Sequence, residues 1–198
     1  MLSRPEPMVT DAAEVLQHIS TEALQAGQGI HRIRNLFNGR DVARERCSLA
    51  DVVAELVPVL DLLANRSAAK LTVTTAADLP PVSIDRLRVQ HVLFTLVQNA
   101  LEAPRAGDRA PAVRIAVDGD RYSVVTSVCD EGTGVTEAAR HSLFRPFFTT
   151  KHHGTGLGLA SSRAIVESHD GTIGFDNIEG GGARFWFRLP AASGDVPR

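Results

Sequence analysis

A carboxylate followed by two glycines is the first feature of the sequence that could bind a small molecule. Asp130 opens the segment Asp130-Glu-Gly-Thr-Gly134, directly after a run of β-favouring residues that ends at Val128. Glycines let the backbone approach a planar ligand closely, and a carboxylate held in an apolar pocket can accept a hydrogen bond from an exocyclic amine such as that of adenine. The same residues also suit an ordinary turn, so the segment alone leaves both interpretations open.

A second glycine-rich segment, Gly154-Thr-Gly-Leu-Gly158, stands immediately before a helical pattern. Unpaired backbone N–H groups at the start of a helix can bind phosphate. A dinucleotide-binding fingerprint would need another glycine at the position of Leu159, and no G-x-x-x-x-G-K-[ST] loop occurs in the sequence. The segment therefore indicates a phosphate site outside these two classes.

Two further polar side chains could face such a ligand. Asn99 lies among apolar positions on the same expected helix as Glu102, and its amide oxygen could ligate Mg²⁺; a buried amide that caps a backbone group is the alternative. Lys151 precedes the second glycine-rich segment and could reach a phosphate as a point charge, or it could be a solvated loop lysine. The adjacent pair His152-His153 lacks a third ligand at useful spacing, so no zinc site is expected.

The elements that must position these residues follow from periodicity. Apolar residues at helical spacing predict helices at 49–65, 85–103 and 157–168, the first capped by Ser48. Alternating β-favouring residues predict a strand at 70–75 and two hairpins, one of 113–117 with 122–128 and one of 172–175 with 184–189. Strands grouped with helices between them indicate an α+β sandwich whose sheet is covered by helices on one face.

The N-terminal part of the sequence carries a narrow apolar seam. Its positions alternate at spacings of three and four, which favours a helical bundle or coiled coil with a partner over a lone surface helix. Asn38-Gly39 ends the helix, and polar residues 40–46 form an expected connector. The seam residues are Val9, Ala12, Leu16, Ile19, Ala23, Ala26, Ile30, Ile33 and Phe37.

Four segments come in the order of the N, G1, F and G2 boxes of the GHKL ATPases, as found in sensor histidine kinases. Residues 45–190 resemble the ATP-binding catalytic domain of these kinases, and four ordered boxes are far more specific than one. The resemblance implies a Bergerat-type sandwich with a mixed, mostly antiparallel sheet, and an enzyme that uses ATP and Mg²⁺ to phosphorylate a histidine. The boxes are Asn99-Ala-Leu-Glu-Ala103, Asp130-Glu-Gly-Thr-Gly134, Leu143-Phe-Arg-Pro-Phe-Phe-Thr-Thr-Lys151 and Gly154-Thr-Gly-Leu-Gly158-Leu159.

The resemblance also implies roles for single residues. Asp130 would contact adenine, Asn99 would hold Mg²⁺, and the residues between Gly134 and Gly154 would form a mobile lid anchored by Phe144, Phe147 and Phe148. Thr95 stands where the family usually has a second Asn, so a hydroxyl would position metal or water less firmly. The expected catalytic residues are Asn99, Thr95 and Lys151, and the expected nucleotide-binding residues are Asn99, Glu102, Asp130, Gly132, Gly134, Phe147, Lys151, Gly154, Thr155, Gly156, Leu157 and Gly158.

The seam helix resembles the second helix of a kinase dimerisation domain, which implies a homodimer through residues 9–37. Neither His18 nor His31 is followed by the acidic residue and proline of a phosphoacceptor helix, so the acceptor histidine is expected on another segment or a partner chain. The resulting division is residues 1–44 as dimerisation helix and linker, 45–190 as catalytic domain, and 191–198 as a tail.

Composition excludes several other classes. With 43% hydrophobic residues and a net charge of −2, the chain is expected to fold as a soluble protein. No apolar run approaches the roughly 20 residues of a membrane span, the N-terminus is not that of a signal peptide, and no sustained basic run indicates nucleic-acid binding. The two cysteines lack metal-ligand spacing and are expected as free thiols of a cytoplasmic protein.

Two classes of function remain at this stage. The first is the catalytic half of a two-component kinase, with ATP and the receiver domain of a response regulator as partners. The alternative is a non-catalytic nucleotide-binding module that docks a response regulator or kinase through the seam helix. A serine kinase of the anti-sigma type is disfavoured by the long seam helix.

Overall fold

The computed structural model describes residues 44–105, 110–151 and 154–192, which belong to one compact unit that runs from Asp41 to Arg198. The expected helix at residues 9–37, with His18 and His31, lies outside the described residues, as do His152 and His153. The division of the chain at residues 44 and 190 therefore stays a prediction.

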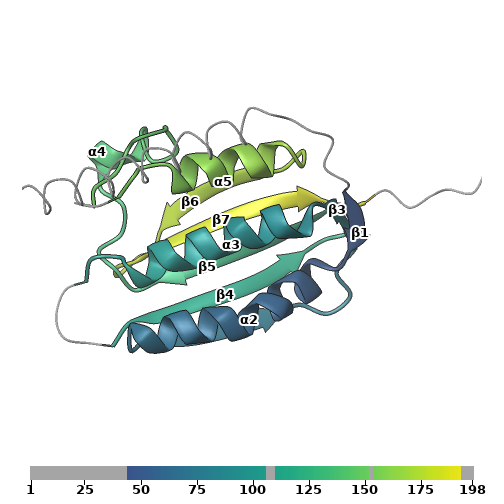
Figure 1. Cartoon of the computed structure of the whole chain (residues 1–198), viewed down its shortest axis with the longest axis horizontal. Helices are drawn as coiled ribbons and strands as arrows, with labels where there is room; N and C mark the ends of the chain where they lie inside the picture. The colour runs from purple at the N-terminus through teal and green to yellow at the C-terminus, as the bar shows by residue number, and fades with distance from the viewer. Residues whose placement is uncertain (1–43, 106–109, 152–153, 193–198) are drawn as a thin grey trace, which may run out of the picture. The chain divides into compact units, whose positions relative to one another are not determined.

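A five-stranded sheet forms one layer of the domain (Figure 1). The strand order is β2-β4-β5-β7-β6; β2 pairs with β4 in parallel, and every other neighbouring pair is antiparallel. This confirms the mixed, mostly antiparallel sheet that the resemblance to the GHKL ATPases implied. The strands are β2 (Lys70–Thr75), β4 (Ala112–Gly119), β5 (Ser123–Asp130), β6 (Thr172–Asn177) and β7 (Ala183–Pro190).

Three helices cover one face of this sheet, as Figure 1 shows. They are α2 (Leu49–Arg66), α3 (Arg86–Leu101) and α5 (Gly158–Glu167), and a short α4 (Glu137–Arg140) precedes α5. The first two start at side-chain caps, since Ser48 accepts a hydrogen bond from the Asp51 N–H and Asp85 accepts one from the Arg88 N–H. The three long helices are those that apolar periodicity predicted.

A small second sheet corrects one expectation. Glu45–Cys47 forms β1, which pairs antiparallel with β3 (Val82–Ile84), although the sequence predicted residues 40–46 to be an irregular connector. Three residues are too few to show a period of two, so neither strand was predicted. Val82 and Ile84 are nevertheless fully buried, which explains why this pairing is part of the domain.

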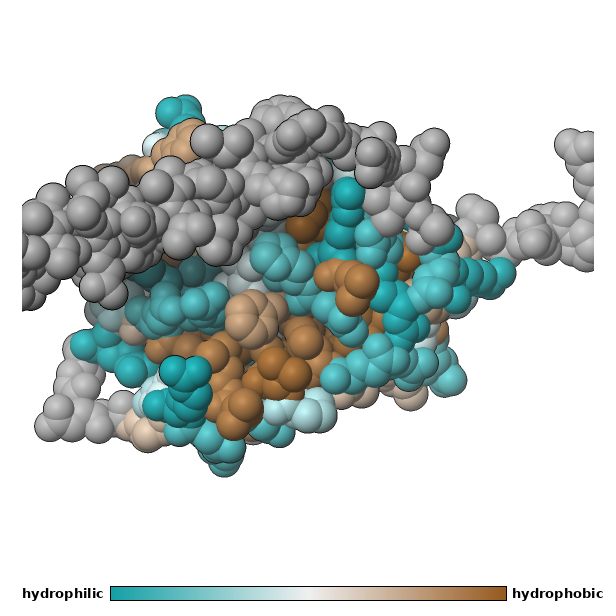
Figure 2. All heavy atoms as spheres, viewed as in Figure 1, coloured by the Kyte–Doolittle hydropathy of each residue, from teal (hydrophilic) through white to brown (hydrophobic). Residues whose placement is uncertain are grey.

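The hydrophobic core fills the space between the helices and the inner face of the sheet. On β4, for example, Val113, Ile115 and Val117 point inward and are buried, while Arg114 between them is exposed. On the face drawn in Figure 2, apolar side chains also gather over α2, where Val59 and Leu62 are exposed. None of the helices in the described part of the chain is both long and apolar enough to cross a membrane.

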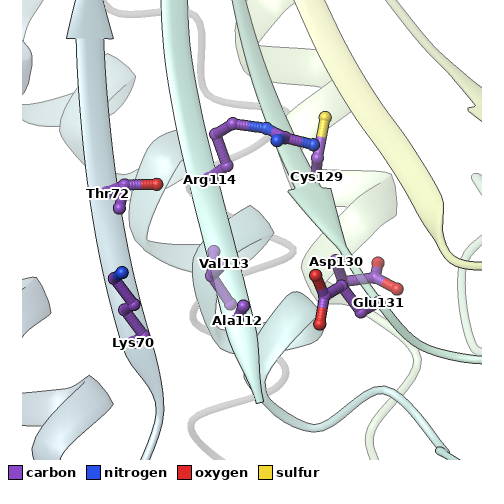
Figure 3. Close-up of a pocket in the computed structure, with 8 residues that line it drawn as sticks. All are labelled: Lys70, Thr72, Ala112, Val113, Arg114, Cys129, Asp130 and Glu131. Carbon is purple, nitrogen blue, oxygen red and sulfur yellow. The ribbon is translucent and has the colours of Figure 1, made fainter.

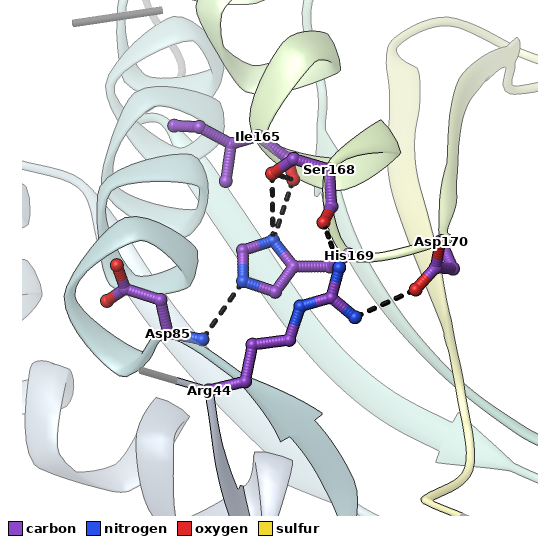
Figure 4. Close-up of polar contacts among 6 residues, drawn as sticks. All are labelled: Arg44, Asp85, Ile165, Ser168, His169 and Asp170. Atoms are coloured by element: carbon purple, nitrogen blue, oxygen red, sulfur yellow. Dashed lines mark hydrogen bonds and ion pairs between the residues drawn. The ribbon is translucent and has the colours of Figure 1, made fainter. Parts of the chain in front are cut away.

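A buried histidine fastens α5 to α3 at the end where α3 begins (Figure 4). The Nε2 atom of His169 accepts a hydrogen bond from the Asp85 N–H at 2.9 Å, so the proton of the neutral ring lies on Nδ1, which donates to the Ile165 carbonyl at 2.7 Å. Beside it, Arg44 donates to the Asp170 carboxylate at 2.8 Å and to the Ser168 carbonyl. The linker that enters the domain thus contacts the C-terminal end of α5.

Candidate functional site

The segments singled out in the sequence meet at the opposite ends of the same two helices. A Cβ atom placed on Gly158, the first residue of α5, would lie 3.1 Å from the Cγ2 atom of Thr95 on α3. The loop after α3 in turn contacts the loop after β5, because the Thr133 N–H donates to the Pro104 carbonyl at 2.8 Å. The C-terminal part of α3, the end of β5 and the start of α5 therefore surround one site.

Asp130 lies at the end of β5, where Figure 3 shows it beside Glu131. It is only 5% exposed, and its Oδ1 atom accepts hydrogen bonds from the N–H groups of Gly132 at 2.8 Å and Ala183 at 3.2 Å. Burial raises the pKa of this carboxyl above its ordinary value, against the lowering effect of the two N–H donors and of Arg105. Because the hydrogen bonds from described residues fall on Oδ1, the other oxygen is the one available to a ligand.

Close packing around Asp130 explains the glycines beside it. A Cβ atom on Gly132 would lie 2.8 Å from the Cβ atom of Ala103, and one on Gly182 would lie 2.1 Å from the carbonyl oxygen of Asp130. Gly132 was predicted as a site residue, whereas Gly182 was predicted only as part of a hairpin turn. Its contribution follows from the pairing of β5 with β7, which no local motif encodes.

Asn177 is a second residue that sequence reasoning missed. Its side-chain oxygen accepts a hydrogen bond from the Val135 N–H at 2.8 Å, and its amide group donates to the Val135 carbonyl at 2.8 Å. Gly134, which has a positive φ of 76°, lies directly before this double contact. Asn177, at the end of β6, therefore holds the beginning of the 134–154 segment in place. The sequence gave no signal of this role, because an Asn at the end of a strand is not part of any recognisable motif.

The second glycine-rich segment packs against the phenylalanine box. Gly156 has a φ of 65°, and a Cβ atom there would lie 2.4 Å from the backbone carbon of Phe147, whose N–H donates to the Gly156 carbonyl at 3.0 Å. Gly154 is similarly close to the Thr149 hydroxyl, at 2.4 Å from an added Cβ. These contacts leave no space for larger side chains at either glycine.

The expected anchoring role of the three phenylalanines is only partly right. Phe144 and Phe148 pack against the core, and the Phe144 ring centroid lies 6.4 Å from that of Phe175. Phe147, in contrast, is 67% exposed. Its backbone has a φ of 66° and is held by Gly156, and this conformation directs the ring away from the core. Phe147 therefore does not anchor the segment through its side chain.

Lys151 joins the 134–154 segment to the end of α3 through side-chain hydrogen bonds. Its Nζ atom donates to Asn99 Oδ1 at 3.0 Å and to Glu102 Oε2 at 2.5 Å. The other Glu102 oxygen accepts a hydrogen bond from Gln98 Nε2 at 3.1 Å. The sequence predicted all three of Asn99, Glu102 and Lys151 as site residues but did not predict that they bond to one another.

The same oxygen atoms suit a divalent cation. Carboxylate and amide oxygens are the ligands that Mg²⁺ accepts from proteins, and in this structure the Asn99 and Glu102 oxygens already bond to the positively charged Lys151. Thr95, also expected to be catalytic, is buried and its methyl group faces Gly158. The donor set at the end of α3 therefore fits the magnesium ion that the sequence motifs implied.

The start of α5 suits an anion. Its N-cap position, Leu157, makes no side-chain cap hydrogen bond with the described residues, so the N–H groups of the first turn are left for a ligand. Thr155 and the glycines at 154, 156 and 158 surround this turn without large side chains. A phosphate chain could thus run from the start of α5 toward the Asn99 and Glu102 oxygens at the end of α3.

A separate small pocket opens beside Asp130 (Figure 3). It has a volume of about 170 Å³, below the roughly 300 Å³ at which ligand pockets begin. It is lined by Lys70, Thr72, Ala112, Val113, Arg114, Cys129, Asp130 and Glu131. Its size does not match a nucleotide, and no ligand is assigned to it.

Comparisons with known proteins give one consistent result. Residues 84–193 match the family model described as histidine kinase-, DNA gyrase B- and HSP90-like ATPase. The C4-dicarboxylate transport sensor protein DctS of Rhodobacter capsulatus is 32% identical over 201 residues, which cover 100% of this chain and 30% of DctS. The chain therefore spans less than half the length of that curated relative.

Solved structures show the same likeness. The nucleotide-free catalytic domain of the histidine kinase ThkA superposes with a TM-score of 0.68 at 31% identity, over 76% of this chain and 97% of that domain. The complex of ThkA with the response regulator protein TrrA gives a TM-score of 0.72 at 26% identity, over 96% of this chain and 53% of that chain.

Proposed function

The chain belongs to the histidine kinase-, DNA gyrase B- and HSP90-like ATPase family, and we propose that it is the ATP-binding catalytic part of a two-component sensor histidine kinase. The observation that carries the proposal is the buried Asp130, whose Oδ1 is held by the Gly132 and Ala183 N–H groups. Its second oxygen can accept a hydrogen bond from the 6-amino group of adenine, and the close-packed glycines let the base approach the backbone.

The triphosphate is bound by the other end of the site. The uncapped first turn of α5 offers backbone N–H groups to the phosphates, and Lys151 offers a mobile positive charge. Asn99 and Glu102 would hold Mg²⁺, which neutralises charge on the phosphate oxygens when it is bound. The chain thereby positions the γ-phosphoryl group and stabilises the charge that develops on it.

Transfer needs a nucleophile from elsewhere. An imidazole nitrogen attacks the γ-phosphorus, the bond from that phosphorus to the bridging oxygen breaks, and ADP leaves with the electron pair. We propose that the acceptor histidine lies on another segment or on a partner chain. Residues 9–37 would form the contact of a homodimer, and the protein would act in the cytoplasm. A receiver domain of a response regulator is the proposed downstream partner, supported by the complex in which ThkA binds TrrA.

A second candidate is a nucleotide-binding docking module without transferase activity. The observation that favours it is Thr95, which stands where the family that the chain resembles usually has a second Asn, and which is buried with its methyl group toward Gly158. Such a module would bind ATP and contact a regulator or kinase, but it would not label a histidine. The two candidates share the nucleotide site and differ in phosphoryl transfer.

Binding of a fluorescent ATP analogue to the wild type and to Asp130→Asn tests the shared site. We expect tighter binding in the presence of Mg²⁺ and a loss of roughly 10- to 100-fold in the variant, because a hydrogen bond to a charged acceptor is lost. Asp61→Asn, on the exposed side of α2, is the matched control and should bind as the wild type does. No binding by the wild type would overturn both candidates.

Transfer is tested separately. The chain is incubated with γ-labelled ATP and a dimerisation fragment that carries its phosphoacceptor histidine, and acid-labile label on the fragment is measured. A labelled fragment supports the kinase, whereas tight ATP binding without any label supports the docking module.

A further inference from the structure

The Asn99 and Glu102 oxygens that would bind a magnesium ion accept hydrogen bonds from the ammonium group of Lys151 in this structure. Lys151 Nζ lies 3.0 Å from Asn99 Oδ1 and 2.5 Å from Glu102 Oε2. Both contacts are hydrogen bonds donated by the ammonium group, and they bring one positive charge to the point where the side chains of Asn99 and Glu102 converge. A divalent cation bound to the same two oxygens would lie next to this ammonium group, and the two positive charges would repel each other there.

The ion pair between Lys151 and Glu102 can be broken easily, so another cation can replace the lysine. The Lys151 and Glu102 side chains are 40% and 46% exposed, so water screens the ion pair and its loss is inexpensive. Gln98 holds the other carboxylate oxygen of Glu102 and keeps that side chain in place when the lysine leaves. The site therefore stays formed while its cation changes.

The backbone of Lys151 is held independently of its ammonium group. The Lys151 N–H donates to the Thr149 hydroxyl at 3.0 Å, and the Lys151 carbonyl accepts a hydrogen bond from the Gly154 N–H at 3.2 Å. Rotation of the side chain alone can thus move the charge away from α3. Its backbone stays next to the glycine-rich segment at the start of α5.

From these contacts we infer that Lys151 is an internal counter-ion of the Asn99–Glu102 site and competes there with the divalent cation. In the nucleotide-free protein the ammonium group takes the cation's place, and binding of the metal releases it toward the phosphates. This inference rests on the proposed nucleotide site. Since a released lysine has a new anionic partner only when ATP is present, metal and nucleotide favour each other's binding through this one side chain.

Amine reactivity measures the release directly, because Lys70 and Lys151 are the only lysines in the sequence. The nucleotide-free chain is treated briefly with acetic anhydride, and modification of each lysine is followed by mass spectrometry of its peptides. Addition of Mg²⁺ alone should raise the rate at Lys151 by about threefold or more and leave Lys70 unchanged. In Glu102→Gln the rate at Lys151 should be high already and insensitive to Mg²⁺. Equal Lys151 rates with and without Mg²⁺ in the wild type would overturn the inference.

Titration with Mn²⁺, followed by electron paramagnetic resonance without nucleotide, gives the second readout. Lys151→Met keeps most of the side-chain stem but removes the competing charge, so it should bind Mn²⁺ about fivefold more tightly than the wild type. Lys70→Met removes the same charge from strand β2 and should bind Mn²⁺ as the wild type does. Equal affinities for the wild type and a Lys151→Met variant that is folded by circular dichroism would contradict the counter-ion, and the proposed function would stand as long as the wild type binds the ATP analogue. Failure of the wild type to bind the ATP analogue would instead remove the proposed function.

Discussion

At the scale of single residues, Asp130 has opposite effects on stability and on ligand binding. Its pKa is raised by burial, so its contribution to folding is present below the ordinary value of 3.8 and is lost as the pH rises through the raised pKa. The ionised carboxylate that a nucleotide needs is therefore a cost to the nucleotide-free fold at neutral pH. Such a cost at a binding site is a common feature of functional residues.

Asp130→Asn should accordingly be more stable than the wild type at pH 7 without nucleotide. The amide oxygen can still accept from the Gly132 and Ala183 N–H groups, while the buried charge is gone. The difference in the free energy of unfolding, measured by denaturant titration, should shrink toward zero as the pH falls to 3.8 and below. A variant less stable than the wild type at pH 7 would show that the hydrogen bonds to the charge outweigh its burial.

Asp120→Asn is predicted to behave with the opposite sign. Hydrogen bonds from the Tyr122 and Ser123 N–H groups lower the pKa of this exposed carboxyl, so its stabilising effect is present above the ordinary pKa and is lost as the pH falls through the lowered one. The variant should be less stable than the wild type at pH 7, and the two should converge in acid. Measured in the same titrations, this pair of variants separates burial of a charge from stabilisation of a charge.

At the scale of helices and strands, the contacts of Figure 4 give two very different predictions. His169→Leu replaces the imidazole with an apolar side chain of similar size. It leaves the Asp85 N–H without its partner, while the Ile165 carbonyl keeps the hydrogen bond from Ser168 Oγ, and it should cost about 1–3 kcal/mol of unfolding free energy. Arg44→Ala breaks an ion pair whose partners are 38% and 71% exposed, and should cost at most about 1 kcal/mol. Equal losses in the two variants would mean that burial does not decide the strength of this cluster.

The elements also show what the sequence could predict and what it could not. The helices α2, α3 and α5 and both hairpins were predicted to within a few residues, because their apolar periods extend over several turns or alternations. The strands β1 and β3 are three residues long and carry no period, and α4 has only four residues. The parallel pairing of β2 with β4 links segments far apart in the chain, and no turn motif announces it.

The site follows the same rule. Asp130, Gly132 and the glycine-rich segment were predicted because their order along the chain resembles a known set of boxes. The roles of Gly182 and Asn177 depend on strand pairing and on a contact across 42 positions of the chain, so local sequence gave no signal. The bond between Lys151 and Glu102 spans 49 positions and was likewise not predicted.

At the scale of the whole molecule, the described residues contain all the nucleotide-binding groups that the proposal uses. The compact unit from Asp41 to Arg198 has its own core and includes β1, which pairs with β3, and Arg44, which contacts the end of α5. The predicted seam at residues 9–37 lies outside that unit. The chain should therefore divide into a part that binds ATP and a part that brings two chains together.

A fragment of residues 41–198 should fold cooperatively, bind the ATP analogue within about twofold of the full chain, and be monomeric in analytical ultracentrifugation, whereas the full chain should be dimeric. The reason is that the nucleotide-binding residues named in the proposal all lie after Arg44, while the narrow apolar seam of the sequence lies at 9–37. A fragment of residues 48–198 is the sharper comparison, because it also lacks β1, Arg44 and the Glu45 partner of Arg86. It should unfold about 1–3 kcal/mol more easily, since Val82 and Ile84 on β3 lose their paired strand. A dimeric 41–198 fragment would place the association surface on the catalytic part, and a 48–198 fragment as stable as 41–198 would show that the domain begins after β1.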